Sequence, residues 1–561
     1  MKVINHVFIF ISLILFSTNI SFTQNSTTNS TKTFEVSKDD PAIIKAIKQN
    51  DIEKLKELLN KGENVNCVDD EDGTSLHWAI YLNNENAFIE VLKHNPNINK
   101  KDKYGMTPLH WAIEKNNLKI TTDLLIFGVE IDEKDNNGHT PLHLAAKLNR
   151  IEIITKLVQF GANKESKDNH GDSPLHLAIK HNKIESIKKL AELGANVNCV
   201  EENNYTPLHL AVNLNNENAT VEILKYKPDI NKQDIYGQTP LHLASIVNNI
   251  KAIEKLVTLG ADINTQNIYS CTPLHGAVQF NKIESIKTLI KFNANIEEKN
   301  NEGCTALHVA VKHNHIEVIS LLTKLGANIN SKDNDGWTSL HWTVNQNNIK
   351  LTEKLIELGT DKNSKNLTGL TALHIAIYNN NLEMIKILLN LNVEKESKDN
   401  DGCTPLHLSA KLNRKEAIKL LIKYGTNKNA KDNYGDSPLH LAAEFNRVDA
   451  IATLVELGTN IEIKNNSGET PLHIAVIENN IEVISTLVEL GANIEAKDKY
   501  GYTSLHLAAN KNYLEIIKNL LTFGANKTIK NNNGETALDL YIKISSTLDE
   551  KPNIKIVKML S

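Results

Sequence analysis

The stretch GHTPLHLAAKLNRIEIITKLVQFGANKE, residues 138–165, decides the fold. It contains a four-residue motif that begins at Thr140: Thr or Ser, then Pro, Ser or Ala, then Leu, then His or Asp. The same motif begins at fifteen positions from Thr74 to Thr536, and every interval is 33 residues. A degenerate sixteenth copy covers residues 41–66. A length of 561 residues would ordinarily suggest three or four globular domains, but this register predicts a repeat protein instead.

Each copy carries the local signals of two short helices. The motif Thr or Ser is a preferred N-cap, and Pro follows it in nine of fifteen copies, where a helix needs no N–H donor. The motif Leu is present in all fifteen copies and is predicted to be core. Asn recurs nine residues after the motif start, from Asn83 to Asn512, and Asn tolerates the left-handed conformation that ends a helix. Apolar residues at spacings of three and four then predict a second helix.

Glycine is almost wholly committed to turns. Of the 25 glycines, 12 lie two residues before the motif and 11 lie at the end of the second helix. Four copies have another residue at that second helix end, namely Asn95, Lys227, Asn293 and Asn392. Each unit is therefore predicted to be an antiparallel helix pair, joined to the next unit by a hairpin-like finger.

This pattern resembles the ankyrin repeat family, through the opening Gly-x-Thr-Pro-Leu-His-x-Ala-Ala and the closing Gly-Ala-Asn of residues 138–165. The resemblance covers residues 41–561 and implies an all-α fold, an α-solenoid of about sixteen stacked repeats in a single elongated curved domain. Residues 41–73 are expected to form an N-terminal capping repeat, residues 74–535 fourteen repeats, and residues 536–561 a C-terminal capping repeat. Asp539 replaces the motif His in the last copy.

Fourteen of the 21 histidines occupy the motif position. A ladder of metal sites is one interpretation, but successive histidines are a whole repeat apart, whereas zinc needs four ligands at about 2 Å. The resemblance implies that each histidine instead forms a hydrogen bond to the backbone between adjacent repeats. We therefore predict no metal site and assign a framework role to His77, His110, His143, His176, His209, His242, His275, His308, His341, His374, His407, His440, His473 and His506.

The N-terminus carries the features of a secretory signal. Lys2 precedes an apolar run over residues 7–16, which is about the length of a signal core and too short to cross a bilayer. We expect residues 1–23 to be a signal peptide, with an uncleaved anchor as the alternative, and residues 24–40 to be a flexible polar leader. No later stretch is apolar enough to span a membrane. The protein is accordingly expected to be secreted or exported.

Composition and motifs exclude several functional classes. The net charge is −5, and only Arg150, Arg414 and Arg447 supply guanidinium groups, which argues against a nucleic-acid partner. The sequence contains no phosphate loop, dinucleotide fingerprint, nucleophile elbow or His-Glu-x-x-His motif. Five cysteines spread over the chain do not form a disulfide scaffold. We expect no enzymatic activity and no cofactor.

What remains is a recognition surface. In the ankyrin family, partners are usually held by the fingers and the first helices, which line the concave side. Interface cores are enriched in aromatic side chains. The variable finger and helix positions place the candidate partner-binding residues at Tyr104, Tyr205, Tyr236, Tyr269, Phe280, Trp337, Tyr434, Phe445, Tyr500 and Tyr502. Alternatively, each ring only packs along its own finger. Trp78, Trp111 and Trp342, next to the motif His, are interpreted as partly buried framework.

The leading hypothesis is a monomeric, non-enzymatic scaffold that binds another protein through its concave face. Together with a secretory signal, the resemblance implies an exported protein that engages host proteins. The alternative is a structural spacer that has no dedicated binding site. The sequence does not identify the partner.

Overall fold

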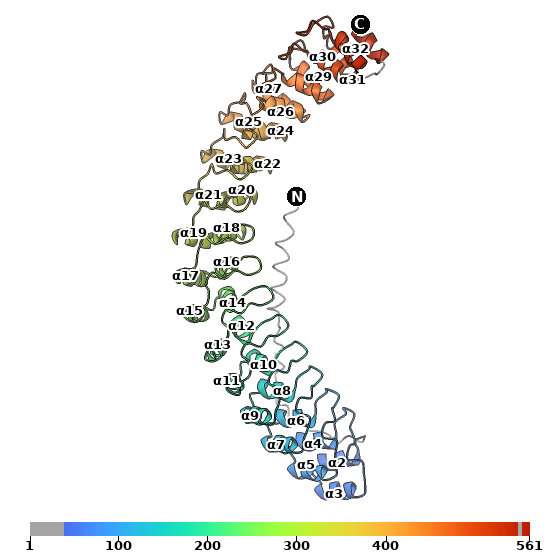
Figure 1. The fold of residues 1–561 in the computed structure, drawn as a ribbon, viewed down its shortest axis with the longest axis vertical. Coiled ribbons are helices and arrows are strands. Elements are labelled where there is room, and N and C mark those ends of the chain that lie inside the picture. Colours follow the sequence, from blue (N-terminus) through green and yellow to red (C-terminus); the bar gives the residue numbers. More distant parts are fainter. Residues whose placement is uncertain (1–36, 38, 548–551) are drawn as a thin grey trace. The chain divides into compact units, whose positions relative to one another are not determined.

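The computed structural model describes residues 37, 39–547 and 552–561. In this part of the chain, sixteen first helices alternate with sixteen second helices. Figure 1 shows the helices following one another in pairs along the chain. The first helices are α2 (Ala42–Lys48), α4 (Ser75–Tyr81), α6 (Pro108–Glu114), α8 (Pro141–Lys147), α10 (Pro174–Lys180), α12 (Pro207–Asn213), α14 (Pro240–Val247), α16 (Pro273–Gln279), α18 (Ala306–Lys312), α20 (Ser339–Asn345), α22 (Ala372–Tyr378), α24 (Pro405–Lys411), α26 (Pro438–Glu444), α28 (Pro471–Ile477), α30 (Ser504–Asn510) and α32 (Ala537–Thr547).

The second helices run antiparallel to them and complete the pairs. They are α3 (Ile52–Asn60), α5 (Glu85–Leu92), α7 (Leu118–Ile126), α9 (Ile151–Gln159), α11 (Ile184–Glu192), α13 (Glu217–Leu224), α15 (Ile250–Thr258), α17 (Ile283–Lys291), α19 (Ile316–Lys324), α21 (Ile349–Glu357), α23 (Leu382–Asn390), α25 (Lys415–Lys423), α27 (Val448–Glu456), α29 (Ile481–Glu489), α31 (Leu514–Thr522) and α33 (Ile554–Leu560). The prediction of a helical solenoid built from sixteen helix pairs is confirmed.

The chain forms two compact units. One comprises Met1–Ala178 and Glu192–Ala195, and the other comprises Ile179–Ala191 and Asn196–Ser561. Within each unit, the first helix of one pair packs on the first helix of the next, as in α4 on α6 and α24 on α26. One pair alone exposes its apolar face, so each pair is stabilised by its neighbours.

The core follows the sequence pattern. The motif leucines from Leu76 to Leu505 are at most 2% exposed, and the last one, Leu538, is partly buried. The small Ala145 beside Leu142 is fully buried. Apolar residues at spacings of three and four on the second helices, such as Ile154 and Leu157, are also fully buried. The core is therefore built mainly from leucine, isoleucine and alanine side chains, with Phe88 as a buried aromatic exception.

Asparagine ends the first helices as predicted. Every Asn from Asn83 to Asn512 at this position has a positive φ, between 52° and 62°. Lys227, which replaces the glycine at the end of α13, also adopts a positive φ of 52°. Three fingers lack the usual glycine at the tip, and there Asp72, Asn204 and Ser270 adopt positive φ angles of 60°, 63° and 56°. The backbone conformation is therefore kept even where the glycine is lost.

We number positions within a repeat from its motif Thr or Ser, so that position −1 precedes it and position +3 is the motif His. The finger is the ten-residue segment from −10 to −1. Among the described residues, the fingers contain no extended strand, and one isolated antiparallel bridge joins Val68 to Thr74. Each finger is instead closed at its base, as where the Asp102 N–H donates to the Met106 carbonyl over 3.0 Å.

No helix in the described ranges is long and apolar enough to cross a membrane. The predicted signal peptide and most of the predicted leader lie outside the described residues. In the last repeat, Asp539 takes over the role of the motif His, because its Oδ2 accepts hydrogen bonds from the Thr536 N–H at 2.9 Å and from the Thr536 hydroxyl at 2.8 Å.

Candidate functional site

The motif histidines tie neighbouring repeats together. In each of the fourteen, Nδ1 accepts a hydrogen bond from the backbone N–H of the motif Thr or Ser at 3.0 to 3.3 Å, which satisfies an otherwise unpaired donor at the helix start. In thirteen of them, Nε2 lies 3.0 to 3.3 Å from the carbonyl at −1 of the next repeat. These bonds join the backbones of adjacent repeats through the histidine ring.

This geometry fixes the protonation state of the rings. Because Nδ1 accepts from an amide N–H, the proton must sit on Nε2, which donates to the carbonyl. Burial lowers the pKa to about 4 for His77, His110, His143, His209, His242, His341 and His374. These imidazoles are therefore neutral at physiological pH.

The Thr–His pairs superficially resemble a nucleophile and its base. In one repeat, the Thr140 hydroxyl lies 2.8 Å from His143 Nδ1. Both side chains are fully buried, however, so a substrate cannot reach the hydroxyl. The pair also recurs in every motif that has a histidine, which indicates a structural role. Within the described ranges, no group of three or more His, Cys, Asp or Glu side chains is placed to hold a metal ion.

None of the five cysteines, all of which lie in the described ranges, forms a disulfide bond. Cys304 is fully buried, and the other four are partly buried. Burial raises the pKa of the Cys271 and Cys304 thiols to about 11, so neither is a ready nucleophile at neutral pH.

Backbone hydrogen bonds run from finger to finger. The carbonyl at −3 accepts from the N–H at −4 of the next finger, as from Asn136 to Tyr104 at 3.0 Å and from Ile268 to Tyr236 at 3.1 Å. Within a finger, the acidic or amide side chain at −5 accepts from the N–H groups at −3 and −1, as Asp102 does from Tyr104 and Met106. The finger therefore uses the backbone of position −3, while its shape does not depend on that side chain.

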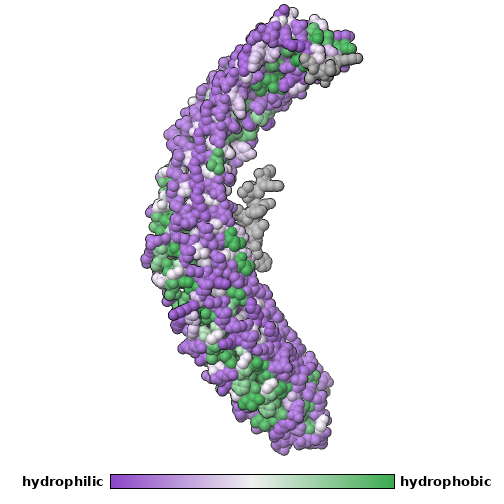
Figure 2. Space-filling model, viewed as in Figure 1, coloured by the Kyte–Doolittle hydropathy of each residue, from purple (hydrophilic) through white to green (hydrophobic). Residues whose placement is uncertain are grey.

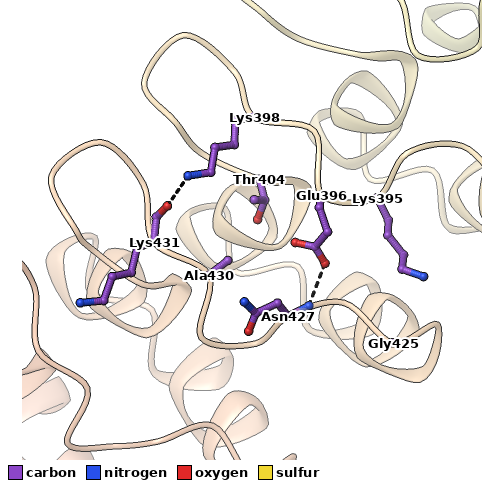
Figure 3. Close-up of a pocket in the computed structure, with 8 residues that line it drawn as sticks. All are labelled: Lys395, Glu396, Lys398, Thr404, Gly425, Asn427, Ala430 and Lys431. Carbon is purple, nitrogen blue, oxygen red and sulfur yellow. Dashed lines mark hydrogen bonds between the residues drawn. The ribbon is translucent and has the colours of Figure 1, made fainter.

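Lysine side chains at −6 form a second series of hydrogen bonds from one repeat to the next. In nine repeats, the lysine ammonium group donates to the carbonyl of position −6 in the next repeat at 2.6 to 2.8 Å. Figure 3 shows one such bond, from Lys398 to Lys431, beside the bond from the Asn427 N–H to Glu396. The four residues that form these two bonds line an open pocket of about 520 Å³. Because these polar groups already bond one repeat to the next, the pocket has the features of a structural groove.

Aromatic residues at −3 lie at the finger tips. Tyr434 is 69% exposed, Tyr500 57%, Tyr104 51% and Tyr269 38%, while Tyr236 is partly buried. Next to the rings of Tyr104 and Tyr500, lysine ammonium groups lie 5.0 Å from the ring centres. These tyrosines are accessible to another molecule.

Aromatic residues at −1 are placed differently. Tyr205 and Tyr502 stack on the motif histidines of their own repeats, with ring centres 5.6 and 6.0 Å apart, and Trp337 lies 6.1 Å from His341. All three are partly buried. Burial also raises the pKa of the Tyr205 hydroxyl. These rings pack along their own fingers and keep one edge at the surface.

The first-helix candidates, Phe280 and Phe445, lie just after α16 and α26 and are partly buried. The ammonium group of Lys411 lies 4.5 Å from the centre of the Phe445 ring. The structure thus distributes the predicted aromatic residues over finger tips, finger bases and helix ends.

Three tryptophans at +4 form hydrogen bonds that the sequence analysis did not identify. The indole Nε1–H groups of Trp78, Trp111 and Trp342 donate to the carboxylates at −5 at 2.7, 2.9 and 2.9 Å. Each tryptophan follows its aspartate by nine residues, which is the signal in the sequence that pairs them. They are partly buried, as predicted, but two of them also contact Tyr81.

Exposed apolar side chains also occur away from the fingers, where second helices end. Ile126 is 68% exposed, Phe127 58%, Leu259 56% and Phe160 45%. Figure 2 shows that hydrophilic side chains cover most of the visible face and that hydrophobic side chains gather in separate patches. The finger face and the second-helix face therefore both expose side chains that a partner can bury.

Comparisons with known proteins identify the repeat. The family model described as "Ankyrin repeats (3 copies)" matches residues 43–135, 117–201, 185–267, 266–333, 340–432 and 424–498. A second family model, "Ankyrin repeats (many copies)", matches residues 487–540. No curated protein matches the chain.

Two solved structures illustrate the likeness. The chain is similar to the ankyrin repeat domain of Bcl-3, described as a unique member of the IkappaB protein family, with 24% identity over 40% of this chain and 99% of that one, and a TM-score of 0.36. It is also similar to the human ASB11 ankyrin repeat domain, with 24% identity over 40% of this chain and 96% of that one, and a TM-score of 0.34.

Proposed function

Because the chain belongs to the ankyrin repeat family, whose repeats are generally protein–protein interaction modules and typically non-enzymatic, we propose that it binds a partner protein through its fingers and first helices. This is the face that the sequence analysis expects to be concave. The proposal treats the protein as a monomeric scaffold whose repeats hold side chains in place for recognition.

One observation carries the proposal. At position −3 the finger needs only the backbone, since the carbonyl and the N–H are both used in hydrogen bonds. Even so, large aromatic side chains occupy this position repeatedly, and Tyr434 is 69% exposed. A tyrosine that the fold does not require, held on a rigid backbone, loses little conformational entropy on binding and offers both apolar area and a hydroxyl.

The finger tips of two adjacent repeats support the proposal most strongly. Ile235 and Tyr236 occupy −4 and −3 of one finger, and Ile268 and Tyr269 occupy the same positions of the next. The Ile268 N–H donates to the Tyr236 carbonyl at 3.1 Å, so the two tips are held side by side. Ile235 is 49% exposed and Ile268 55%. In these two fingers, glutamine replaces the lysine at −6, which makes the tips less charged.

The proposal is tested by affinity capture with the full chain, followed by the double variant Tyr236→Ala and Tyr269→Ala. Alanine keeps the backbone hydrogen bonds of the fingers, so the variant is expected to fold and to lose at least tenfold in affinity for the captured partner. Leu259→Ala, at an exposed position on the second-helix face, is the matched control and is expected to bind normally. If the double variant binds as tightly as the wild type, these finger tips are not the site.

The alternative is a spacer that joins its two ends and recognises nothing along its length. A spacer predicts that no partner is captured reproducibly, or that any partner binds a terminal fragment alone. The repeated exposed tyrosines favour recognition over this alternative, because a spacer gains nothing from exposed rings.

We further propose that the protein is exported and acts on proteins outside the cell that makes it. The support is the sequence pattern of residues 1–23. Mass spectrometry of the mature protein tests this proposal, since cleavage is expected to leave a new N-terminus near Gln24. Recovery of intact Met1 would contradict the cleaved signal and would favour the anchored alternative.

A further inference from the structure

Three aromatic rings on adjacent first helices form one connected group, which we call the α4–α6 aromatic cluster: Trp78 and Tyr81 of α4 and Trp111 of α6. The ring centres of Trp78 and Tyr81 lie 5.5 Å apart at an interplanar angle of 66°, and those of Tyr81 and Trp111 lie 5.1 Å apart at 64°. Both arrangements are edge-to-face, the favoured geometry for aromatic pairs. All three rings are partly buried and keep a surface edge.

The cluster is held rigidly before any partner arrives. The indole of Trp78 donates to Asp69, and that of Trp111 donates to Asp102. The ammonium group of Lys48 covers the Trp78 ring at 3.9 Å from its centre and is paired with Asp40 at 2.9 Å. A partner that binds these rings therefore has no side-chain ordering to perform at this site.

Two lysines, one over the cluster and one on the next first helix, have ammonium groups that form no ion pair among the described residues. Lys115 follows α6, and its ammonium group lies 3.4 Å from the centre of the Tyr81 ring. Lys147 is the last residue of α8, which packs on α6. Among the described residues, neither ammonium group donates a hydrogen bond. Burial lowers the pKa of Lys115, against an opposing attraction from the adjacent Glu114. The ammonium group has thus lost water without forming an ion pair in return.

A lysine in the second unit packs on a tryptophan ring and also forms an ion pair. There the ammonium group of Lys312 lies 4.2 Å from the centre of the Trp342 ring and also pairs with Glu302 at 2.6 Å. Among the described residues, Lys115 forms no ion pair, and Lys411, over the Phe445 ring, shares this property at a site outside the cluster.

We propose that the α4–α6 aromatic cluster, together with Lys115 and Lys147, binds an acidic partner segment that places an apolar or aromatic side chain between its carboxylates. The apolar side chain buries against the edges of Tyr81 and Trp111. The carboxylates pair with the two ammonium groups, which restores to Lys115 the charge compensation that it lacks. This inference rests on the proposed function and names the chemistry of one partner surface.

The test selects random peptides on the full-length protein and measures the affinity of the enriched peptides. Acidic peptides with an aromatic or aliphatic residue are expected to be enriched and to bind Lys115→Glu at least tenfold more weakly, whereas Lys115→Arg is expected to retain binding. Lys411→Glu is the matched control, because Lys411 lies over Phe445 in the other unit, and it is expected to change nothing.

A second variant removes one ring of the cluster, that of Trp111, while keeping the fold. Trp111→Leu combined with Asp102→Asn gives the repeat an amide at −5 and an aliphatic residue at +4, a combination that the chain already carries at Asn465 and Ile474. This double variant is expected to match the wild type in helicity and to lose the acidic peptides at least tenfold.

Several results would overturn the inference. They are enrichment of basic or neutral peptides, equal binding by Lys115→Glu, or equal weakening by Lys411→Glu. Self-association that Lys115→Glu abolishes would assign the surface to a second copy of the chain. If peptides bind but respond only to Tyr236→Ala and Tyr269→Ala, the proposed function stands and this inference fails. If neither peptides nor proteins bind any face, both fail.

Discussion

Replacing Asp234 with asparagine is expected to stabilise the protein at neutral pH. Asp234 Oδ1 accepts from the N–H groups of Tyr236 and Gln238, both at 2.8 Å. Its buried Oδ2 has no hydrogen-bond partner within the described residues, and burial raises the pKa of the carboxyl to about 6. Asparagine fits the position, because Asn267 accepts the same two bonds in the next repeat at 2.9 and 3.0 Å.

The magnitude follows from proton linkage. A carboxyl whose pKa is near 4 when unfolded and about 6 when folded favours the folded state most at low pH, and this contribution is lost as the pH rises from 4 through 6. At about 1.4 kcal/mol per pKa unit, burial of the Asp234 carboxyl lowers the free energy of unfolding by roughly 3 kcal/mol at pH 8 and by roughly 1 kcal/mol at pH 4.5. Asparagine does not ionise, so the variant is expected to recover up to these amounts.

The opposite change is expected at Asp333. Its Oδ2 accepts from Trp342 Nε1 at 2.9 Å, and an amide in its place would leave one donor unmatched. Asp333→Asn is expected to destabilise its repeat by about 1–3 kcal/mol. Adding Trp342→Leu removes the unmatched indole and is expected to restore part of that loss. The pair of sites thus separates the effect of an unpartnered carboxylate oxygen from that of a charged side chain in general.

Hydrogen–deuterium exchange reports the free energy of local opening, which suits a repeat array whose unfolding is not all-or-none. Opening of the fingers that carry Asp234 and Asp333 is compared between each variant and the wild type at pH 8 and pH 4.5. Comparison at the same pH cancels the contribution of the histidines. Destabilisation by Asp234→Asn at pH 8, or a gain that does not vary with pH, would refute the reasoning, because Oδ2 would then have a donor.

Three further outcomes follow from the framework. Acidification from pH 6.5 towards 4 is expected to lower the free energy of unfolding by roughly 2 kcal/mol at pH 5 for each motif histidine with a folded pKa of about 4. The reason is that only the unfolded chain binds the proton in this range. Loss of the helical circular dichroism signal well above pH 4 checks this prediction. In urea unfolding, Gly402→Ala is expected to destabilise the protein more than Gly425→Ala. A Cβ at position 402 would lie 2.6 Å from the Asn433 backbone nitrogen, whereas a Cβ at position 425 would meet open space. Equal effects would mean that the steric contact contributes nothing and that backbone strain explains both losses. His374→Leu is expected to cost about 2–5 kcal/mol and to speed exchange in two adjacent repeats, since it breaks the link to the Cys403 carbonyl; an effect confined to one repeat would contradict the linking role.

The fold was predictable because every repeat carries the same local sequence signals. The 33-residue register, the N-cap Thr and the Asn at each first-helix end all describe backbone conformations that short-range sequence controls. Asn380, for example, adopts a φ of 58°, as its position predicts. The replacement of His by Asp539 was also interpretable as a cap, although the two hydrogen bonds to Thr536 needed the structure.

Side-chain placement was less predictable, because it depends on the neighbouring repeat. The sequence places Tyr205 and Tyr236 in consecutive fingers, but only the structure shows that Tyr205 stacks on His209 while the Tyr236 finger tip bonds to the next one. The cluster of Trp78, Tyr81 and Trp111 was missed for the same reason, since residues 33 positions apart become neighbours only through stacking.

The most direct test of the proposed recognition face is hydroxyl-radical footprinting of the full chain with and without its captured partner. The account predicts protection of aromatic side chains on the fingers and first helices, such as Tyr236, Tyr269 and Trp111. It also predicts unchanged labelling of Phe127 and Phe160 at the ends of second helices. Protection of Phe127 and Phe160 with unchanged labelling of the finger tyrosines would contradict the central claim.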